Sequence, residues 1–335
     1  MLKRRLGRTG LSVSEIGLGG IPIQRTSIED AVKIIRRAVQ LGVNFIDTAR
    51  VYTDSELKIG AAIKETRNSC IIASKSRALT KLEMEQDIKT SLNTLKVSRI
   101  DLYQLHNISS IENYERVIKP DGALSALQEA QQTGLINFIG ITSHTPELLL
   151  KVIPSGLFDT VQFPFNPLET SGADIIKLAN QHDIGTIIMK PLAGGAFKNA
   201  KAALKWILQH QVSVVVPGVD NIQQAVENIS ASGSRLTPAE RESIFKEATE
   251  IDKQVCRRCE YCQPCPQGIK IPVILLMDGY YQRYGLADWA RERYQQLVDI
   301  TPEQCIDCGL CEEKCPYKLP IRKLIREAHN RLKTQ

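Results

Sequence analysis

Short apolar runs alternate with amphipathic helical patterns from residue 13 to residue 230, and this alternation limits the fold more than any other feature. Most of the apolar runs are continuous, as expected for strands covered on both faces by helices. The runs lie at 13–20, 43–49, 70–75, 100–106, 136–143, 160–163, 185–190 and 212–218, and helical patterns follow at 27–42, 55–66, 81–96, 121–134, 145–153, 172–182, 197–210 and 221–230.

Eight such units in succession predict an α/β fold, a (β/α)8 TIM barrel, which typically needs about 250 residues. Several helical patterns open on Ser, Thr, Asp or Asn, which is the expected capping chemistry. An open doubly wound sheet is the alternative, but its GxGxxG fingerprint after the first strand is missing. We place the barrel at 1–235 and a second domain at 236–335, joined through a helix that begins with the cap Thr237 and Pro238.

Composition favours a soluble cytoplasmic protein. No window of the sequence has the 18 or more consecutive apolar residues of a membrane-spanning helix, and the start MLKRRLGRTGLSV lacks the apolar core of a signal peptide. The formal charge of +6 is spread along the chain with acids interleaved, so we expect neither a nucleic-acid surface nor a membrane surface. Closely spaced cysteines in a reducing compartment hold metal more often than they form disulfides.

Four polar residues follow consecutive predicted strands, where a barrel places its chemistry. Asp47 ends the second run, Tyr52 follows on the same loop, Lys75 ends the third run and His106 ends the fourth. Each alone has an ordinary structural explanation, such as a helix cap, a half-buried ring, a rim charge or a core histidine. Their arrival at three consecutive strand ends favours a shared site.

These four residue types suit the reduction of a carbonyl by hydride. A phenol is a weak acid at neutral pH, and an ammonium beside it lowers its pKa by stabilising the phenolate. Lys75 can supply that charge, and Asp47 can keep the buried ammonium protonated. His106 can donate a hydrogen bond to the substrate carbonyl. The group would then deliver a proton to an oxygen that is gaining negative charge.

The motifs FIDTARVY, ASK and YQLH, in this order and at these strand ends, resemble those of the aldo-keto reductases over about residues 2–235. The resemblance implies that Asp47, Tyr52, Lys75 and His106 form a catalytic tetrad, with Tyr52 as general acid and NADP or NAD as cofactor. It implies a small-molecule carbonyl or alcohol as substrate. The cofactor contacts that it implies are Gly19, Gly20, Ser143, Gln162, Met189, Lys190, Leu192, Pro217, Gly218, Gln224, Glu227 and Asn228.

Several positions depart from the family pattern. His144 follows Ser143 where many members have Asn, and Met189 stands where many have an aromatic ring against the nicotinamide. Gly218 and Gln224 replace the Lys and Arg that contact the adenosine 2′-phosphate in many members. We therefore expect weaker discrimination between NADPH and NADH.

Eight of the nine cysteines lie in two runs near the end of the sequence. The run CIDCGLCEEKCP has the spacing C-x2-C-x2-C-x3-C-P of bacterial ferredoxins, and CRRCEYCQPCP is a near copy with one residue fewer before its last cysteine. Structural zinc is the alternative, because four-thiolate sites also use CxxC pairs. The close packing of the third and fourth cysteines, each fourth cysteine being followed by Pro, favours two 4Fe-4S clusters. Cys70 stands alone in an apolar strand and is expected to be an inert core residue.

In two-cluster ferredoxins the fourth cysteine of each run binds the other cluster. The resemblance therefore implies one cluster on Cys256, Cys259, Cys262 and Cys315, and a second cluster on Cys265, Cys305, Cys308 and Cys311. The intervening segment 269–304 has helical patterns and predicts two helices between the runs. Such an appendix, a small ferredoxin-like iron-sulfur domain, resembles that of a subgroup of bacterial and archaeal aldo-keto reductases.

Three functional hypotheses follow. The first is an NAD(P)H-dependent carbonyl reductase whose clusters are structural or sense oxygen. The second is an enzyme that exchanges electrons with a ferredoxin-like partner through the clusters. The third is a non-enzymatic redox sensor or scaffold, against which the intact tetrad argues. Sequence does not separate the first two, and it does not name the substrate.

Overall fold

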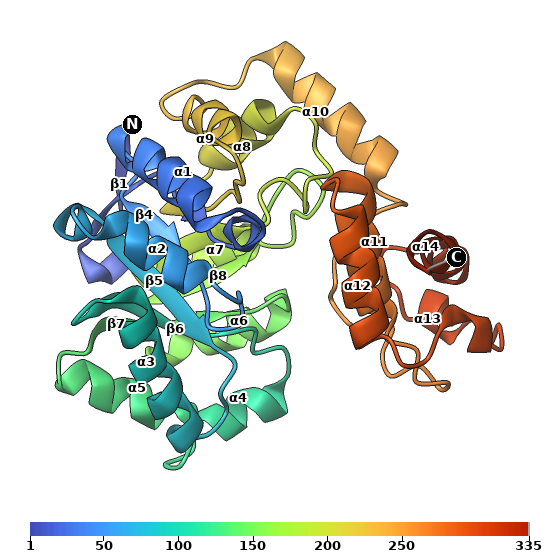
Figure 1. The fold of residues 1–335 in the computed structure, drawn as a ribbon, viewed down its shortest axis with the longest axis horizontal. Coiled ribbons are helices and arrows are strands. Elements are labelled where there is room, and N and C mark those ends of the chain that lie inside the picture. Colours follow the sequence, from blue (N-terminus) through green and yellow to red (C-terminus); the bar gives the residue numbers. More distant parts are fainter. Residues whose placement is uncertain (334–335) are drawn as a thin grey trace. The chain divides into compact units, whose positions relative to one another are not determined.

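The computed structural model describes residues 1–333, which form two compact units (Figure 1). The first unit contains Met1–Pro191 and Asn199–Arg241, and the second contains Leu192–Lys198 and the chain from Glu242 onward. Helix α10 (Pro238–Ile251) crosses this division.

The first unit is a (β/α)8 barrel, which confirms the predicted fold class. Its strands form a parallel sheet in which each strand pairs with its neighbours in sequence. Bridges from Ile16 to Val215 and from Gly19 to Gly218 join the first strand to the last. The strands are β3 (Leu18–Gly19), β4 (Phe45–Asp47), β5 (Ile71–Ser76), β6 (Ile100–Leu105), β7 (Ile136–Thr142), β8 (Thr160–Pro164), β9 (Gly185–Met189) and β10 (Val214–Val215).

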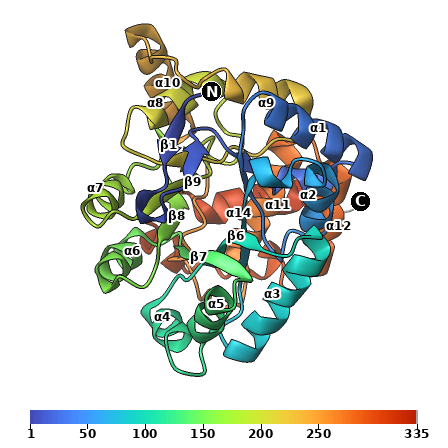
Figure 2. The ribbon, with the colours of Figure 1, turned by 90° about the vertical axis from the view of Figure 1, so that its left-hand side faces the viewer.

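Amphipathic helices cover the outside of these strands (Figure 2). Helix α1 shows why they form: Ser27 caps its first turn by accepting from Asp30 N at 3.0 Å, and the side chains spaced along one face are buried. Helix α4 was not predicted. The barrel helices are α1 (Ile28–Gln40), α2 (Ser55–Ile63), α3 (Lys81–Leu95), α4 (Ile111–Val117), α5 (Ala123–Gln132), α6 (Pro146–Val152), α7 (Ala173–Gln181), α8 (Ala200–Leu208) and α9 (Ile222–Ile229).

An antiparallel hairpin, β1 (Lys3–Arg5) and β2 (Ser12–Ser14), precedes the barrel and was not predicted. The Arg4 guanidinium ties it to the chain before β10, donating to Val212 O at 2.9 Å and to Leu208 O at 2.8 Å. Leu6, in the hairpin loop, is fully buried against inward-facing residues of the strands. The hairpin therefore closes the end of the barrel opposite the strand carboxyl ends.

The second unit is built from α11 (Ile271–Arg283), α12 (Ala287–Leu297), α13 (Leu310–Glu313) and α14 (Ile321–Leu332). Helices α11 and α12 lie between the two cysteine runs, which confirms the two helices predicted there. Their buried side chains, such as Ile274 and Ala290, pack with Ile325 of α14 in one core.

Short 3-10 helices lie at Gly7–Thr9, Pro22–Arg25, Arg67–Ser69, Ile153–Ser155 and Pro302–Gln304.

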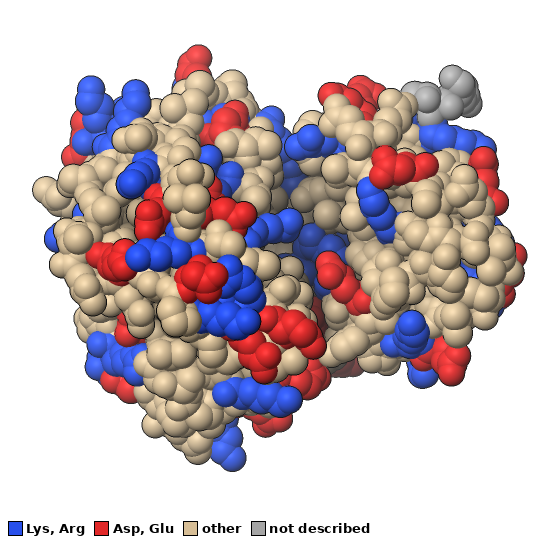
Figure 3. Space-filling model, turned by 90° about the horizontal axis from the view of Figure 1, so that it is seen from below, with Lys and Arg blue, Asp and Glu red and all other residues tan. Residues whose placement is uncertain are grey.

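Surface charge is mixed on both units. Lysine and arginine side chains alternate with aspartate and glutamate over the face drawn in Figure 3. Among residues 1–333 no helix has the length and apolar character needed to cross a bilayer.

Candidate active site and cysteine cavities

Three neighbouring strands and one loop bring the predicted tetrad together. Asp47 is the last residue of β4, Lys75 lies near the end of β5, and His106 directly follows β6. Because these strands are parallel and paired in register, their carboxyl ends meet at one edge of the barrel. Tyr52 reaches the same place from the loop between β4 and α2.

A buried ion pair lies at the centre of this site. The Lys75 ammonium is 2.6 Å from Asp47 Oδ2 and donates to Thr48 O at 2.8 Å. Only 1% of the Lys75 surface is exposed. Burial lowers the pKa of Lys75, and the attraction of Asp47 opposes this change.

Tyr52 lies between the lysine and the histidine. The Lys75 Nζ is 5.3 Å from the centroid of the Tyr52 ring, and the His106 ring meets that ring edge-on with centroids 5.7 Å apart. Burial, and then the charges of Lys75 and Arg77, lower the pKa of His106 well below its usual value. The imidazole is therefore neutral at pH 7 and can donate one hydrogen bond.

A second charged network anchors the loop that carries Tyr52, and sequence reasoning missed it. Arg50, two residues before Tyr52, pairs with the fully buried carboxylate of Glu56, which also accepts from Ser74 Oγ at 2.6 Å. Arg50 N also donates to Lys75 O at 3.0 Å. The only sequence signal for this network was an arginine inside the FIDTARVY motif.

The predicted nicotinamide contacts follow the next strands of the barrel. Ser143 directly follows β7, and Gln162 lies in β8 beside it, since Ser143 N donates to Gln162 O at 3.0 Å. Gln162 is 1% exposed, and among the described residues its Oε1 has no hydrogen-bond partner. An amide oxygen buried in this way fits the carboxamide of a nicotinamide. His144, the departure from the family pattern, lies 2.6 Å (Nδ1) from Asn107 Oδ1.

Met189 ends β9 and Lys190 follows it, and Lys190 contacts a residue that sequence reasoning missed. Asn166 is fully buried after β8, and its side chain donates to Lys190 O at 3.0 Å. Lys190 itself has a positive φ of 51°, which few non-glycine residues adopt. Leu192 belongs to the segment that groups with the second unit.

The predicted phosphate and adenine contacts lie where β3 meets the chain after β10. Gly19 N donates to Pro217 O at 2.9 Å, and a Cβ on Gly218 would lie 2.6 Å from Pro22 Cγ, so this joint accepts only glycine. Gly20 N donates to Asp47 O at 2.7 Å, which links this joint to the tetrad.

Helix α9 follows this joint and carries the other predicted adenine-side residues. Asn221 caps the helix through Gln224 N at 2.9 Å, and Gln224 Oε1 accepts from Asp220 N at 3.0 Å. Glu227 is exposed and Asn228 is buried. Arg25, which sequence reasoning missed, lies 3.5 Å from Asp220 with its side chain 5% exposed.

Two cavities in the second unit are lined by cysteines. The first, which we call cavity A, is lined by the thiols of Cys256, Cys259, Cys262 and Cys315. The second, cavity B, is lined by Cys265, Cys305, Cys308 and Cys311, and also by Cys262. The structure thus brings the last cysteine of each run to the first three of the other.

The surroundings of the thiols are largely apolar. Burial raises the pKa of Cys262 to about 12 and also raises the pKa values of Cys259 and Cys311, so these thiols are protonated unless a metal binds them. Arg258 N donates to Cys256 Sγ at 3.4 Å. Eight thiols in two apolar cavities fit iron-sulfur clusters. Cys70 is buried at the start of β5 with a raised pKa, as expected of an inert core residue.

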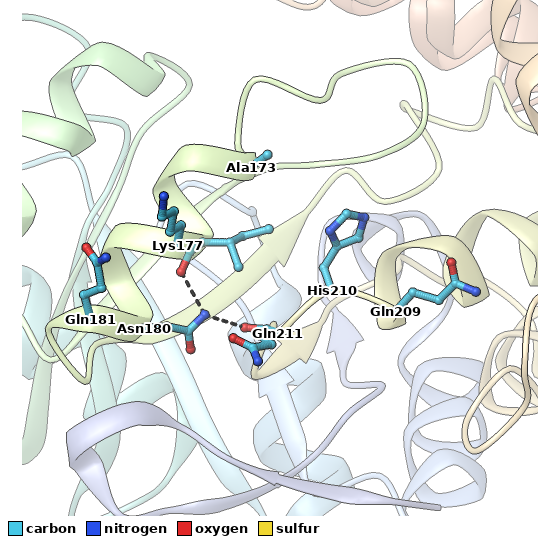
Figure 4. A pocket seen from close by; sticks show the side chains of 8 residues that line it. Ala173, Lys177, Asn180, Gln181, Gln209, His210 and Gln211 are labelled. Atoms are coloured by element: carbon cyan, nitrogen blue, oxygen red, sulfur yellow. Dashed lines mark hydrogen bonds between the residues drawn. The ribbon is translucent and has the colours of Figure 1, made fainter.

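An open hollow of about 540 Å³ lies elsewhere, between α7 and the end of α8 (Figure 4). Asn180 bridges it, donating to Ile176 O at 2.8 Å and to Gln211 O at 2.9 Å. It is lined by Lys177, His210, four neutral polar residues and the apolar Ala173 and Ile176, and no tetrad residue reaches it. We assign it no chemical role.

Comparison with known proteins agrees with this geometry. The model of the aldo/keto reductase family matches residues 15–202, more than half of the chain. The chain belongs to the aldo/keto reductase family. A model described as a 4Fe-4S dicluster domain matches residues 255–320. The chain is therefore an aldo-keto reductase-type oxidoreductase with a C-terminal 4Fe-4S domain.

Individual relatives cover the barrel. "Uncharacterized oxidoreductase YqkF" of Bacillus subtilis is 26% identical over 306 residues, which cover 75% of this chain and 98% of the relative. "L-galactose dehydrogenase" of Arabidopsis thaliana is 26% identical over 280 residues, covering 68% of this chain and 87% of the relative. The holo form of aldo-keto reductase AKR11C1 from Bacillus halodurans superposes with a TM-score of 0.65 at 26% identity, covering 74% of this chain and 96% of that structure.

Proposed function

We propose that the barrel transfers hydride between NAD(P)H and the carbonyl carbon of a small-molecule substrate, with Tyr52 as general acid. The buried pair of Lys75 and Asp47 beside the Tyr52 ring carries this proposal. NAD(P)H, when bound, supplies the hydride. In the reverse direction the same site oxidises an alcohol.

Each side chain of the tetrad has a separate role in proton transfer or substrate orientation. The Lys75 ammonium stabilises negative charge on the Tyr52 oxygen, so the phenol gives up its proton more readily. Asp47 holds the ammonium charged in its buried position. Neutral His106 donates a hydrogen bond to the substrate oxygen and orients the carbonyl for attack. Arg50 and Glu56 hold the Tyr52 loop against β5.

The proposed cofactor site runs from Gln162 and Ser143 to the joint at Gly218. An aldo/keto reductase from Klebsiella pneumoniae was solved in complex with NADP and acetate, and its fold matches this barrel with a TM-score of 0.63. We propose that either NADP or NAD binds here, because no lysine or arginine occurs in the segment 217–224. Arg25, whose side chain is 5% exposed, lies 3.5 Å from Asp220 of that segment.

We propose that the second unit holds two 4Fe-4S clusters, one in cavity A and one in cavity B. Each cavity offers four thiols, and the domain model that matches this region is of a dicluster type. When bound, each cluster supplies one-electron redox chemistry. Such clusters require a reducing compartment, which supports a cytoplasmic location.

The test starts with anaerobic purification of the full chain, followed by a visible spectrum, iron and sulfide counts, and a panel of aldehydes and ketones with NADPH and NADH. Tyr52→Phe should abolish carbonyl reduction while cofactor binding stays nearly unchanged. Tyr114→Phe, on α4 in the same unit, is the matched control and should keep full activity. Substantial turnover by Tyr52→Phe would refute the assigned acid.

A second candidate function is electron exchange with a ferredoxin-like partner. Cys308 is the exposed cysteine of cavity B, and two apolar side chains flank it in the sequence, Ile306 at 61% and Leu310 at 39% exposure. Reduction of the clusters by a reduced ferredoxin, and slower reduction in an Ile306→Ser and Leu310→Ser double variant, would support it. Equal rates for both proteins would count against it.

A further inference from the structure

A buried arginine lies beside cavity A. Arg257 follows Cys256 and lines the cavity together with the four thiols, and only 5% of its surface is exposed. Its guanidinium donates to Asp252 O at 2.8 Å and to Val255 O at 3.0 Å. The guanidinium carbon lies 4.2 Å from the centroid of the Tyr317 ring, which lines the same cavity. Hydrogen bonds to two backbone carbonyls and the contact with the Tyr317 ring therefore hold a permanent positive charge at the cavity wall.

The charge is only partly neutralised. Arg257 pairs with the Asp252 carboxylate, whose side chain is 48% exposed, whereas the side chain of Arg257 is 2% exposed. Water therefore screens the field of the carboxylate more than that of the guanidinium. The carboxylate of Glu260 also lines the cavity but belongs to an exposed residue, so the buried guanidinium is the less screened of these charges.

Cavity B has a different electrostatic environment. The guanidinium that lines it, Arg322, has a side chain 37% exposed and pairs with Glu312 at 2.8 Å. Its ligand Cys308 is exposed to solvent. Charges near cavity B are therefore better compensated and better screened than the charge of Arg257.

We propose that Arg257 raises the reduction potential of the cluster in cavity A, and so sets how readily that cluster accepts an electron. This inference rests on the proposed function, because it requires that cavity A holds a 4Fe-4S cluster. Reduction adds one electron to the cluster and its thiolates, and no bond forms or breaks. The added negative charge is stabilised by a nearby buried cation, since net charge is one of the factors that set cluster potentials.

The test is a redox titration of the anaerobically purified full chain with dithionite as reductant, followed by electron paramagnetic resonance and visible absorption. The wild-type chain should show two one-electron waves. In Arg257→Gln one wave should move to lower potential, by about tenfold or more in the reduction equilibrium constant, or about 59 mV. In Asp252→Asn the same wave should move the other way, because the cation loses its counterion.

Two controls separate charge from structure. Arg257→Lys keeps the charge but not the hydrogen bonds of the guanidinium to Asp252 and to Val255 O, so the melting temperature should fall while most of the potential is kept. Arg322→Gln at cavity B removes an exposed, paired cation and should move either wave by less than about threefold in the equilibrium constant.

Several outcomes would overturn the inference: no shift in Arg257→Gln, equal shifts of both waves, or the same shift in Arg257→Lys as in Arg257→Gln. If Arg257→Gln does not load its clusters, two other variants decide the question. Asp252→Asn should raise the reduction potential of the cluster in cavity A. Tyr317→Leu, which frees the guanidinium from the cavity wall, should lower it. Failure of the proposed function looks different, because the wild-type chain would then lack cluster absorption and iron.

Discussion

Asp47→Asn should destabilise the barrel and make its stability depend on pH. The change removes the carboxylate that lies 2.6 Å from the Lys75 ammonium but keeps the shape of the side chain. Lys75 is 1% exposed, and breaking a buried ion pair by removing one partner costs about 3–5 kcal/mol. Because the attraction of Asp47 opposes the lowering of the Lys75 pKa by burial, removing the carboxylate should lower this pKa further.

The sign of the pH dependence follows from the direction of the Lys75 shift. Burial already holds the pKa of Lys75 below the value of 10.5 that it has in the unfolded chain. Between the two pKa values the unfolded chain binds more protons, so the free energy of unfolding rises with pH, by at most about 1.4 kcal/mol per pH unit. In Asp47→Asn the pKa of Lys75 in the folded chain falls further, so the pH range in which stability rises with pH extends toward neutral pH. The variant should therefore gain stability with rising pH in a range where the wild-type chain changes little.

The measurement is urea unfolding of the barrel between about pH 6 and pH 9. The chain has two tryptophans, Trp206 in α8 and Trp289 in α12, so a Trp289→Phe background makes the remaining fluorescence report on the barrel. The matched control combines Asp47→Asn with Lys75→Met, which removes the titrating group and should abolish the added pH slope. A free energy of unfolding for Asp47→Asn within about 1 kcal/mol of the wild type at neutral pH, with no added pH slope, would show that Asp47 does not stabilise a charged Lys75.

Other predictions concern activity, cofactor choice and cluster connectivity. Lys75→Met should lower kcat/KM for carbonyl reduction by about a hundredfold or more, and an undisturbed pH-rate profile would count against its pairing with the general acid. The Kd values for NADPH and NADH should differ by less than about a thousandfold, or roughly 4 kcal/mol, because the segment 217–224 lacks a cation; a larger ratio would show that other residues bind the phosphate. Cys315→Ser with Cys256→Ser should leave about four irons, whereas Cys315→Ser with Cys305→Ser should remove both clusters. The reverse pattern would disprove the proposal that the fourth cysteine of each run binds the cluster of the other run.

The pattern of apolar runs predicted the barrel, and the residues that follow these runs predicted which side chains meet at its edge. Continuous apolar runs are typical of strands covered on both faces, and eight of them with intervening helices favour a barrel over an open sheet, whose GxGxxG fingerprint is missing. Parallel strands put their carboxyl ends at one edge, so residues at the ends of successive runs, such as Asp47, Lys75 and His106, had to be neighbours. The cysteine spacing likewise identified an iron-sulfur domain, because cluster geometry imposes short, regular intervals between ligands.

Contacts between groups far apart in the sequence could not be predicted from local patterns. The hairpin that closes the barrel depends on Arg4 reaching Leu208 and Val212, more than two hundred residues away. The network of Arg50 and Glu56, the contact of Asn166 with Lys190 and the burial of Arg257 have no periodic signal in the sequence. Periodicity reports which face of an element is covered, but the partner of a buried charge is chosen by packing between elements, which local patterns do not encode.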